Sequence, residues 1–185
     1  MFDYAAYARQ LREELHRIPE IGFDLPKTIA VVHRELDAMG LSYTDKYGPS
    51  SVTAYINPGM PFTIGLRADM DALPVHETVD VPYKSKIDGA MHACGHDGHT
   101  AYMMILADTL IQFKDQIAGT IRVIHQPAEE VTPGGSKGMI EAGCLNGIDN
   151  VFGIHVMSTM EVGNVYVHPG AVHTGRATFQ VKMTG

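Results

Sequence analysis

Strand-like and helix-like segments alternate along most of this 185-residue chain, and that order narrows its fold more than any other feature. Three stretches carry apolar residues at helical spacing and predict helices, over residues 4–17, 28–39 and about 98–113. Shorter runs rich in β-branched and apolar residues predict strands, over residues 51–57, 62–66, 120–125, 151–156, 162–167 and 176–183. The alternation predicts an α/β fold, with a central mixed, partly parallel sheet flanked by helices.

Composition and charge argue against several classes of function. Hydrophobic residues make up 45% of the chain and charged residues 19%, which is typical of a folded globular domain. The formal net charge is -7 and no basic run occurs, so we expect no binding to nucleic acid, which needs a positively charged surface. No apolar run approaches the ~20 residues of a membrane span, and the N-terminus lacks the basic start of a signal peptide. We therefore expect a cytoplasmic protein that does not bind membranes.

The two cysteines, Cys94 and Cys144, could form a disulfide on number alone. A reduced cytosolic setting is the better interpretation, because Cys94 lies between histidines and Cys144 lies in a glycine-flanked turn. We expect Cys94 to be a metal ligand and Cys144 to be an inert, small apolar residue.

The densest chemical feature is the segment 91–99, which brings together one thiol, three imidazoles and a carboxylate. Cysteine and histidine are preferred ligands of zinc and related ions. Alternate side chains of an extended loop point the same way, so Cys94 and His96 form the natural ligand pair. Asp97 could orient a histidine from behind the ligands, and His99 opens the following helix. The alternative is a polar turn with chance histidines, but such a density of ligand types is rare outside metal sites.

Two pairs of carboxylates follow predicted strands. Glu129 and Glu130 are adjacent and point in different directions, so one can bind a metal ion while the other serves as a base. The alternative for this pair is a solvated acidic turn. Asp69 and Asp71 are either turn residues with a salt bridge to Arg67 or carboxylates that support the metal site.

His155 lies in an apolar, strand-like run. A lone histidine there is usually a core residue, but in a chain short of ligands it becomes a candidate third ligand. The remaining histidines have no comparable support, and we expect them to be structural or exposed: His16, His33, His76, His125, His168 and His173. Residues 133–138 lack the spacing of a phosphate-binding loop and are expected to form a flexible loop.

Four segments, taken in chain order, closely resemble the successive motifs of the M20 metallopeptidase family: residues 67–74, 91–99, 126–130 and 153–156. The resemblance is strongest to the amidohydrolase branch, which contains hippurate hydrolases, indole-acetyl-amino-acid hydrolases and N-acetyl-diaminopimelate deacetylases. Residues 16–20 also fit. The resemblance covers nearly all of the chain, and the segment 91–99 is highly specific.

The resemblance implies a zinc-peptidase-like catalytic domain with a site for two divalent ions, which would be zinc, manganese or cobalt. It implies that Glu129 is the general base, and we count Asp71 with it as a catalytic candidate near the site. Cys94 is implied to bridge the two ions. The implied metal ligands are Cys94, His96, Glu130 and His155.

Members of that family are roughly twice as long as this chain. A smaller lid or dimerisation domain interrupts their catalytic domain, and a last histidine ligand lies near their C-terminus. The resemblance therefore implies that residues 1–172 are the first part of the catalytic domain and residues 173–185 the first strand of the lid. We expect the chain to be a fragment or truncated product, and the full-length enzyme to be a homodimer.

The leading functional hypothesis is metal-dependent hydrolysis of the amide bond of an N-acyl amino acid or short peptide, with Glu129 as base. The alternatives are a dipeptidase or aminoacylase of the same family, and a metal-binding but catalytically inactive fragment. A zinc nucleobase deaminase is disfavoured, because its histidine–glutamate and paired-cysteine elements are missing.

Overall fold

The computed structural model describes residues 3–173 and 179–184, which contain a five-stranded sheet in the order β1-β2-β4-β3-β5. Its strands are β1 (Ser42–Thr44), β2 (Val52–Ile56), β3 (Thr63–Asp69), β4 (Thr120–Gln126) and β5 (Asn150–Gly153). β2 is antiparallel to β1 and to β4, whereas β3 is parallel to both β4 and β5. The predicted mixed, partly parallel sheet is confirmed.

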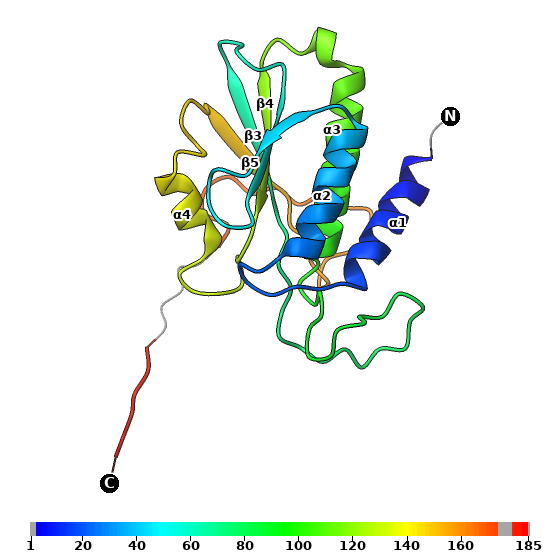
Figure 1. Cartoon of the computed structure of the whole chain (residues 1–185), viewed down its shortest axis with the longest axis vertical. Coiled ribbons are helices and arrows are strands. Elements are labelled where there is room, and N and C mark those ends of the chain that lie inside the picture. The colour runs from blue at the N-terminus through cyan, green and yellow to red at the C-terminus, as the bar shows by residue number, and fades with distance from the viewer. Residues whose placement is uncertain (1–2, 174–178, 185) are drawn as a thin grey trace.

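Helices cover both faces of the sheet (Figure 1). The helices are α1 (Tyr4–His16), α2 (Pro26–Ala38), α3 (His96–Gln112) and the short α4 (Gly135–Glu141), with a 3₁₀ turn at Lys114–Gln116. Side chains of β4 alternate between the two faces, as in any strand. Val123 packs into the core shared with α1, α2 and α3, and Ile124 packs against Met139 of α4. α1 lies on α3 rather than on the sheet.

Local chemistry sets where the first two helices begin. The side chain of Asp3 caps α1 by accepting the backbone N–H of Ala6 at 2.9 Å. α2 begins at Pro26, two residues before the predicted start, because proline suits the first turn of a helix. α3 also begins two residues early, at His96. Residues 135–138 form the first turn of α4, so the expectation of a flexible loop over 133–138 was wrong for that part.

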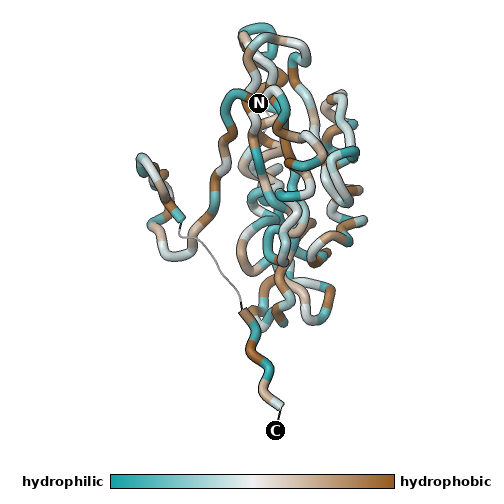
Figure 2. The backbone as a smooth tube through the Cα atoms, turned by 90° about the vertical axis from the view of Figure 1, so that its left-hand side faces the viewer, coloured by the Kyte–Doolittle hydropathy of each residue, from teal (hydrophilic) through white to brown (hydrophobic). Residues whose placement is uncertain are grey.

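The chain after β5 departs most from the predicted elements. β5 ends at Gly153, so the predicted strand 151–156 is too long and His155 lies beyond it. Residues 162–167, all of which are described, form no strand, and Val162 is 99% exposed. A β-branched run becomes a strand only when a neighbouring strand or core covers it. In Figure 2 the stretch of chain that leads into the grey trace near the C-terminus, to which this run belongs, stands away from the packed elements. Of the predicted strand 176–183, residues 176–178 lie outside the described part and residues 179–183 form no strand.

The topology brings the candidate residues to one edge of the sheet. β3, β4 and β5 run parallel, so their carboxyl ends meet on the same side. The connection from β3 to β4 contains α3, and the connection from β4 to β5 contains α4 on the opposite face (Figure 1). The chain thus changes direction around β3, and open α/β sheets bind ligands at such a point. Among the described residues, no helix is both long and apolar enough to cross a membrane.

One core residue makes the fold sensitive to acid. His125 of β4 is fully buried, and neither ring nitrogen has a hydrogen-bond partner among the described residues. Burial lowers the pKa of His125 to about 3, so the folded protein keeps this ring neutral. In the unfolded chain its pKa is about 6.5. The unfolded state therefore binds the proton first, and stability is lost as the pH falls below about 6.5.

His125→Leu is expected to remove this acid sensitivity. Two pH units below 6.5, the variant should retain roughly 3 kcal/mol of unfolding free energy that the parent loses through His125. Urea unfolding followed at several pH values measures this difference. His168→Leu, at an exposed histidine, controls for the loss of an imidazole. Parallel stability curves for His125→Leu and the parent between pH 6.5 and 4.5 would contradict the assignment.

Candidate metal centre

Three loops, each of which follows a strand, converge on His96 at the start of α3. Asp71 follows β3, Glu129 and Glu130 follow β4, and His155 follows β5. His96 is the first residue of α3 and is completely buried. Gly95 precedes His96 and has a φ of 108°, a conformation that favours glycine. A Cβ atom at this position would also lie 2.5 Å from a methyl group of Val156, so a larger residue would not fit.

The His96 ring is surrounded by carboxylates but bonded to none of them. Its Nε2 lies 3.6 Å from Asp69 Oδ2 and 3.8 Å from Glu130 Oε1, and its Nδ1 lies 3.6 Å from Asp71 Oδ1. These distances exceed those of hydrogen bonds, and both nitrogens lack partners among the described residues. Burial opposes its charge, but the three carboxylates outweigh burial and raise the pKa of His96. A buried, unpartnered nitrogen amid carboxylates fits a cation.

Every group of potential metal ligands found in the described part of the chain contains His96. One group combines it with Cys94 and His155, a second with Glu129 and Glu130, and a third with Asp69 and His99. Within each group the ligand atoms lie within 4.8 Å of one another. The first two groups together contain all four side chains that the sequence nominated as ligands, and also the nominated base.

Cys94 carries its proton in the absence of a cation. Burial and the carboxylates of Glu130, Asp69 and Glu129 raise the pKa of its thiol to about 12. Its Sγ lies 3.3 Å from His155 Nε2. Because a thiolate is the metal-binding form, a divalent ion must displace this proton. Cys94 and Cys144 are both free thiols, and Cys144 is buried as expected.

Asp71 holds the loop that carries the two glutamates. Its Oδ1 accepts the backbone N–H of Glu129 at 2.8 Å, and its Oδ2 accepts that of Glu130 at 3.1 Å. Just before them Ala128 is completely buried and has a φ of 53°, a left-handed conformation that costs a non-glycine residue about 1–2 kcal/mol. Such strain persists only where surrounding bonds enforce it. Asp71 thus fixes the directions of both glutamate side chains.

Asp71→Asn is expected to loosen this loop, because the new amide group cannot accept both backbone N–H groups. Both N–H groups are part-buried, and leaving one of them unpaired costs up to about 1–3 kcal/mol, the penalty for a fully buried donor. Hydrogen exchange at the amides of Glu129 and Glu130 should accelerate accordingly. Asp149→Asn is the matched control, since Asp149 accepts the backbone N–H of Thr63 at 2.7 Å at the opposite end of β3. Unchanged exchange at both glutamate amides in Asp71→Asn would rule out this role.

The predicted salt bridge between Asp69 and Arg67 is confirmed. Arg67 Nη1 lies 2.8 Å from Asp69 Oδ2, and Asp69 also lies under the site beside His96. Burial disfavours the charge of Asp69, but the hydrogen bond from His99, together with His96 and Arg67, holds the pKa of Asp69 well below its usual range. Asp69 is therefore ionised at neutral pH.

A second buried network joins α1 to the metal-binding segment, and sequence analysis missed it. Asp97 bonds to His16 Nδ1 at 2.7 Å and accepts a hydrogen bond from Arg12 Nε at 2.9 Å. The other ring nitrogen of His16 lies 3.2 Å from Glu77. The hydrogen bond to Asp97 raises the pKa of His16 despite burial. The only sequence signal for a role of His16 near the site was the resemblance of residues 16–20 to a family motif.

His92 is also buried beside this network, and neither of its ring nitrogens has a partner among the described residues. Burial lowers the pKa of His92 to about 4, so the ring is neutral in the folded protein.

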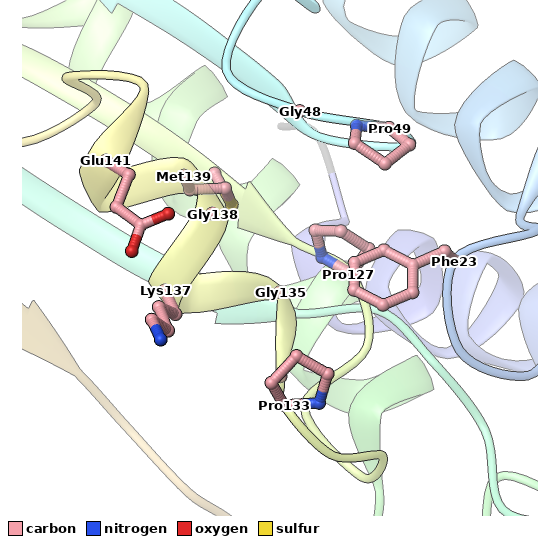
Figure 3. Close-up of a pocket in the computed structure, with 11 residues that line it drawn as sticks. Phe23, Gly48, Pro49, Pro127, Pro133, Gly135, Lys137, Gly138, Met139 and Glu141 are labelled. Carbon is pink, nitrogen blue, oxygen red and sulfur yellow. The ribbon is translucent and has the colours of Figure 1, made fainter.

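One cavity lies beside the glutamate loop rather than at the candidate metal centre. It measures about 370 Å³ and is lined by Phe23, Pro49, Pro127 and Met139 among others (Figure 3). At its edge Gly135 packs so closely on the loop that a Cβ atom would lie 2.1 Å from the carbonyl oxygen of Pro127. None of the nominated ligands lines this cavity.

The chain is similar to a known protein family and to several known proteins. The signature of peptidase family M20/M25/M40 matches residues 65–184. The N-acyl-L-amino acid amidohydrolase of Geobacillus stearothermophilus is 38% identical over 177 residues, covering 94% of this chain and 47% of that protein. Thermostable carboxypeptidase 2 of Saccharolobus solfataricus is 43% identical over 179 residues, covering 95% of this chain and 46% of that protein.

Solved structures give the same result. The crystal structure of a dinuclear metal-binding M20 peptidase from Bacillus subtilis superposes with a TM-score of 0.81 at 37% identity. The superposition covers 86% of this chain and 45% of that one. The chain therefore spans slightly less than half the length of these three relatives.

Proposed function

Since the chain belongs to peptidase family M20/M25/M40, we propose that it takes part in metal-dependent hydrolysis of an amide bond, with N-acyl amino acids as substrates. The observation that carries this proposal is the convergence of Cys94, His155, Glu129 and Glu130 on the unpartnered ring of His96. The name of the Geobacillus stearothermophilus relative supports the choice of substrate class.

The four nominated ligands combine a thiolate, two imidazoles and a carboxylate, a set that suits zinc, cobalt or manganese. Four side chains complete the coordination shell of one tetrahedral ion. We propose two ions, as in the Bacillus subtilis neighbour, which is described as dinuclear. The four nominated side chains would hold these ions between them. When bound, the ions would polarise the scissile carbonyl group and lower the pKa of water.

The two glutamates take different roles in this proposal. Glu130 is half-buried and turns toward His96 and Cys94, which suits a ligand. Glu129 is exposed, which suits a group that must meet water and substrate. Its carboxylate would accept a proton from the attacking water and then donate that proton to the nitrogen of the leaving amine. Asp71 would keep Glu129 aimed by holding its backbone N–H.

The test is release of free amino acid by the chain loaded with manganese or cobalt. We expect N-acetyl amino acids to be hydrolysed, dipeptides to be hydrolysed more slowly, and a chelator to abolish both reactions. A preference for dipeptides would instead favour the peptidase activity suggested by the carboxypeptidase relative. Absence of turnover in a chain with full metal content would refute the catalytic proposal for this chain.

That last outcome would favour a second candidate function, metal binding without catalysis. The observation behind it is the ligand count. Four side chains satisfy one ion but leave a pair of ions short of protein ligands. These relatives are about twice as long as this chain and have further residues to contribute.

A further inference from the structure

The segment that carries His155 has little structure of its own. β5 ends at Gly153, and residues 154–156 follow without regular secondary structure. Ile154 is 62% exposed and Val156 is 47% exposed, so the core does not hold the segment. A ligand on such a segment needs other contacts to stay in position, because a site that is loose by about 1 Å binds poorly.

Two side chains of α3 supply these contacts, one on each side of His155. The hydroxyl group of Tyr102 donates to the carbonyl oxygen of Ile154 at 2.8 Å. The backbone N–H of Val156 donates to His99 Nε2 at 2.9 Å. His99 and Tyr102 are three residues apart, and so lie on the same face of the helix. The His99 ring also contacts the His155 ring, with centroids 4.6 Å apart.

The bond from Val156 settles the tautomer of His99. A backbone N–H can only donate, so Nε2 is the acceptor and carries no proton. The proton therefore lies on Nδ1, which donates to Asp69 Oδ1 at 2.6 Å. With both nitrogens engaged, the 1%-exposed ring has no lone pair left for a metal ion. The group formed by Asp69, His96 and His99 is thus not a separate cation site, although its atoms are close enough.

His99 is itself anchored to the sheet. Asp69 Oδ2 accepts a hydrogen bond from Arg67 Nη1 at 2.8 Å, and Arg67 Nε donates to Gln126 Oε1 at 2.9 Å. Asp69 ends β3 and Gln126 ends β4. A continuous row of polar contacts therefore runs from the ends of two strands through His99 to the backbone beside His155.

We propose that His99 and Tyr102 are positioning residues for His155, which they hold through the backbone of residues 154–156. This inference rests on the proposed function, because it takes His155 to be a metal ligand. Partners behind a metal ligand typically contribute 10–100-fold to metal affinity. His99 and Tyr102 contribute here without touching the ion.

The experiment uses the 185-residue chain and a titration with Co²⁺ alone. His99→Leu cannot accept the N–H of Val156, and we expect it to weaken Co²⁺ binding roughly 10–100-fold. His99→Gln retains an oxygen acceptor and should recover part of the loss. Tyr102→Phe should weaken binding about 2–10-fold, the worth of one hydrogen bond. Thr109→Val is the control, since it removes a hydroxyl group from α3 that donates to the carbonyl oxygen of Ile105 within the helix.

A double-variant cycle separates positioning from a general structural effect. If His99 acts through His155, His99→Leu should cause no further loss of Co²⁺ affinity in a His155→Ala background. An equal loss in both backgrounds, or unchanged affinity in His99→Leu, would overturn the inference.

A second readout needs no metal. In the metal-free chain, hydrogen exchange at the amide of Val156 should accelerate in His99→Leu and less so in His99→Gln. Unchanged exchange would overturn the inference by itself. A parent chain that binds no Co²⁺ would instead refute the proposed metal site, so the two failures can be told apart.

Discussion

Glu129→Gln is expected to lower the turnover of an N-acyl amino acid roughly 10²–10⁴-fold, the usual contribution of a general acid–base group. Glutamine keeps the size of the side chain and removes the proton acceptor. The backbone bond from residue 129 to Asp71 does not depend on the side chain, so the loop should keep its shape. Metal content should remain near that of the parent, because Glu129 is not one of the four nominated ligands. Steady-state kinetics and elemental analysis of the same preparation measure both quantities.

Glu130→Gln is the matched control, because it makes the same chemical change at the adjacent residue. Its carboxylate lies 3.8 Å from His96 and contributes to the raised pKa of Cys94. We expect this variant to lose metal first and activity as a consequence. If Glu129→Gln loses the metal while Glu130→Gln retains it, the two assignments are reversed.

His96→Ala is expected to have the largest effect on metal binding. His96 belongs to all three groups of potential ligands, and its loss leaves buried carboxylates without the neighbouring ring. The affinity for Co²⁺ should fall by more than the roughly 10–100-fold that supporting residues contribute. Cys94→Ala should also weaken Co²⁺ binding, but less than His96→Ala does, because Cys94 belongs to one of the three groups. Elemental analysis after dialysis against a limiting metal concentration measures the bound ion.

His33→Ala provides the control for His96→Ala. His33 lies on α2 and bonds to Asp45 at 3.0 Å, outside the ligand groups. The metal content of the His33→Ala variant should equal that of the parent. Because the substitution at His96 also opens space in a buried region, circular dichroism should confirm that each variant is folded. Unchanged metal content in a folded His96→Ala would contradict the ligand assignment.

The sequence predicted that the site residues lie close together, but it did not predict the hydrogen bonds that hold them there. The carboxyl ends of parallel strands meet on the same side of a sheet, so placing Asp71, Glu130 and His155 at or just beyond the ends of three predicted strands was enough to expect them to lie close together. The hydrogen-bond partners of Asp71 could not be predicted from local sequence, because its bonds to the backbone at residues 129 and 130 span more than fifty residues. Asp97 was expected to orient a histidine, but its partner His16 belongs to a helix that no local pattern links to it.

The errors in the predicted elements have a common physical cause. Residues 162–167 are rich in β-branched side chains, and yet form no strand because no other described residue covers them. β1 was missed for the opposite reason. Its three residues carry no distinctive pattern and become a strand by pairing with β2. Both cases depend on neighbours distant in sequence, to which local propensity is insensitive.

The most direct test of the account is a titration of the 185-residue chain with Co²⁺ followed by absorption spectroscopy. If Cys94 and His96 coordinate the ion, a sulfur-to-cobalt charge-transfer band should grow and saturate, and protons should be released as the thiol ionises. The band should be absent in Cys94→Ala and retained in His33→Ala. A parent chain that binds Co²⁺ without this band, or a band that persists in Cys94→Ala, would contradict the proposed centre.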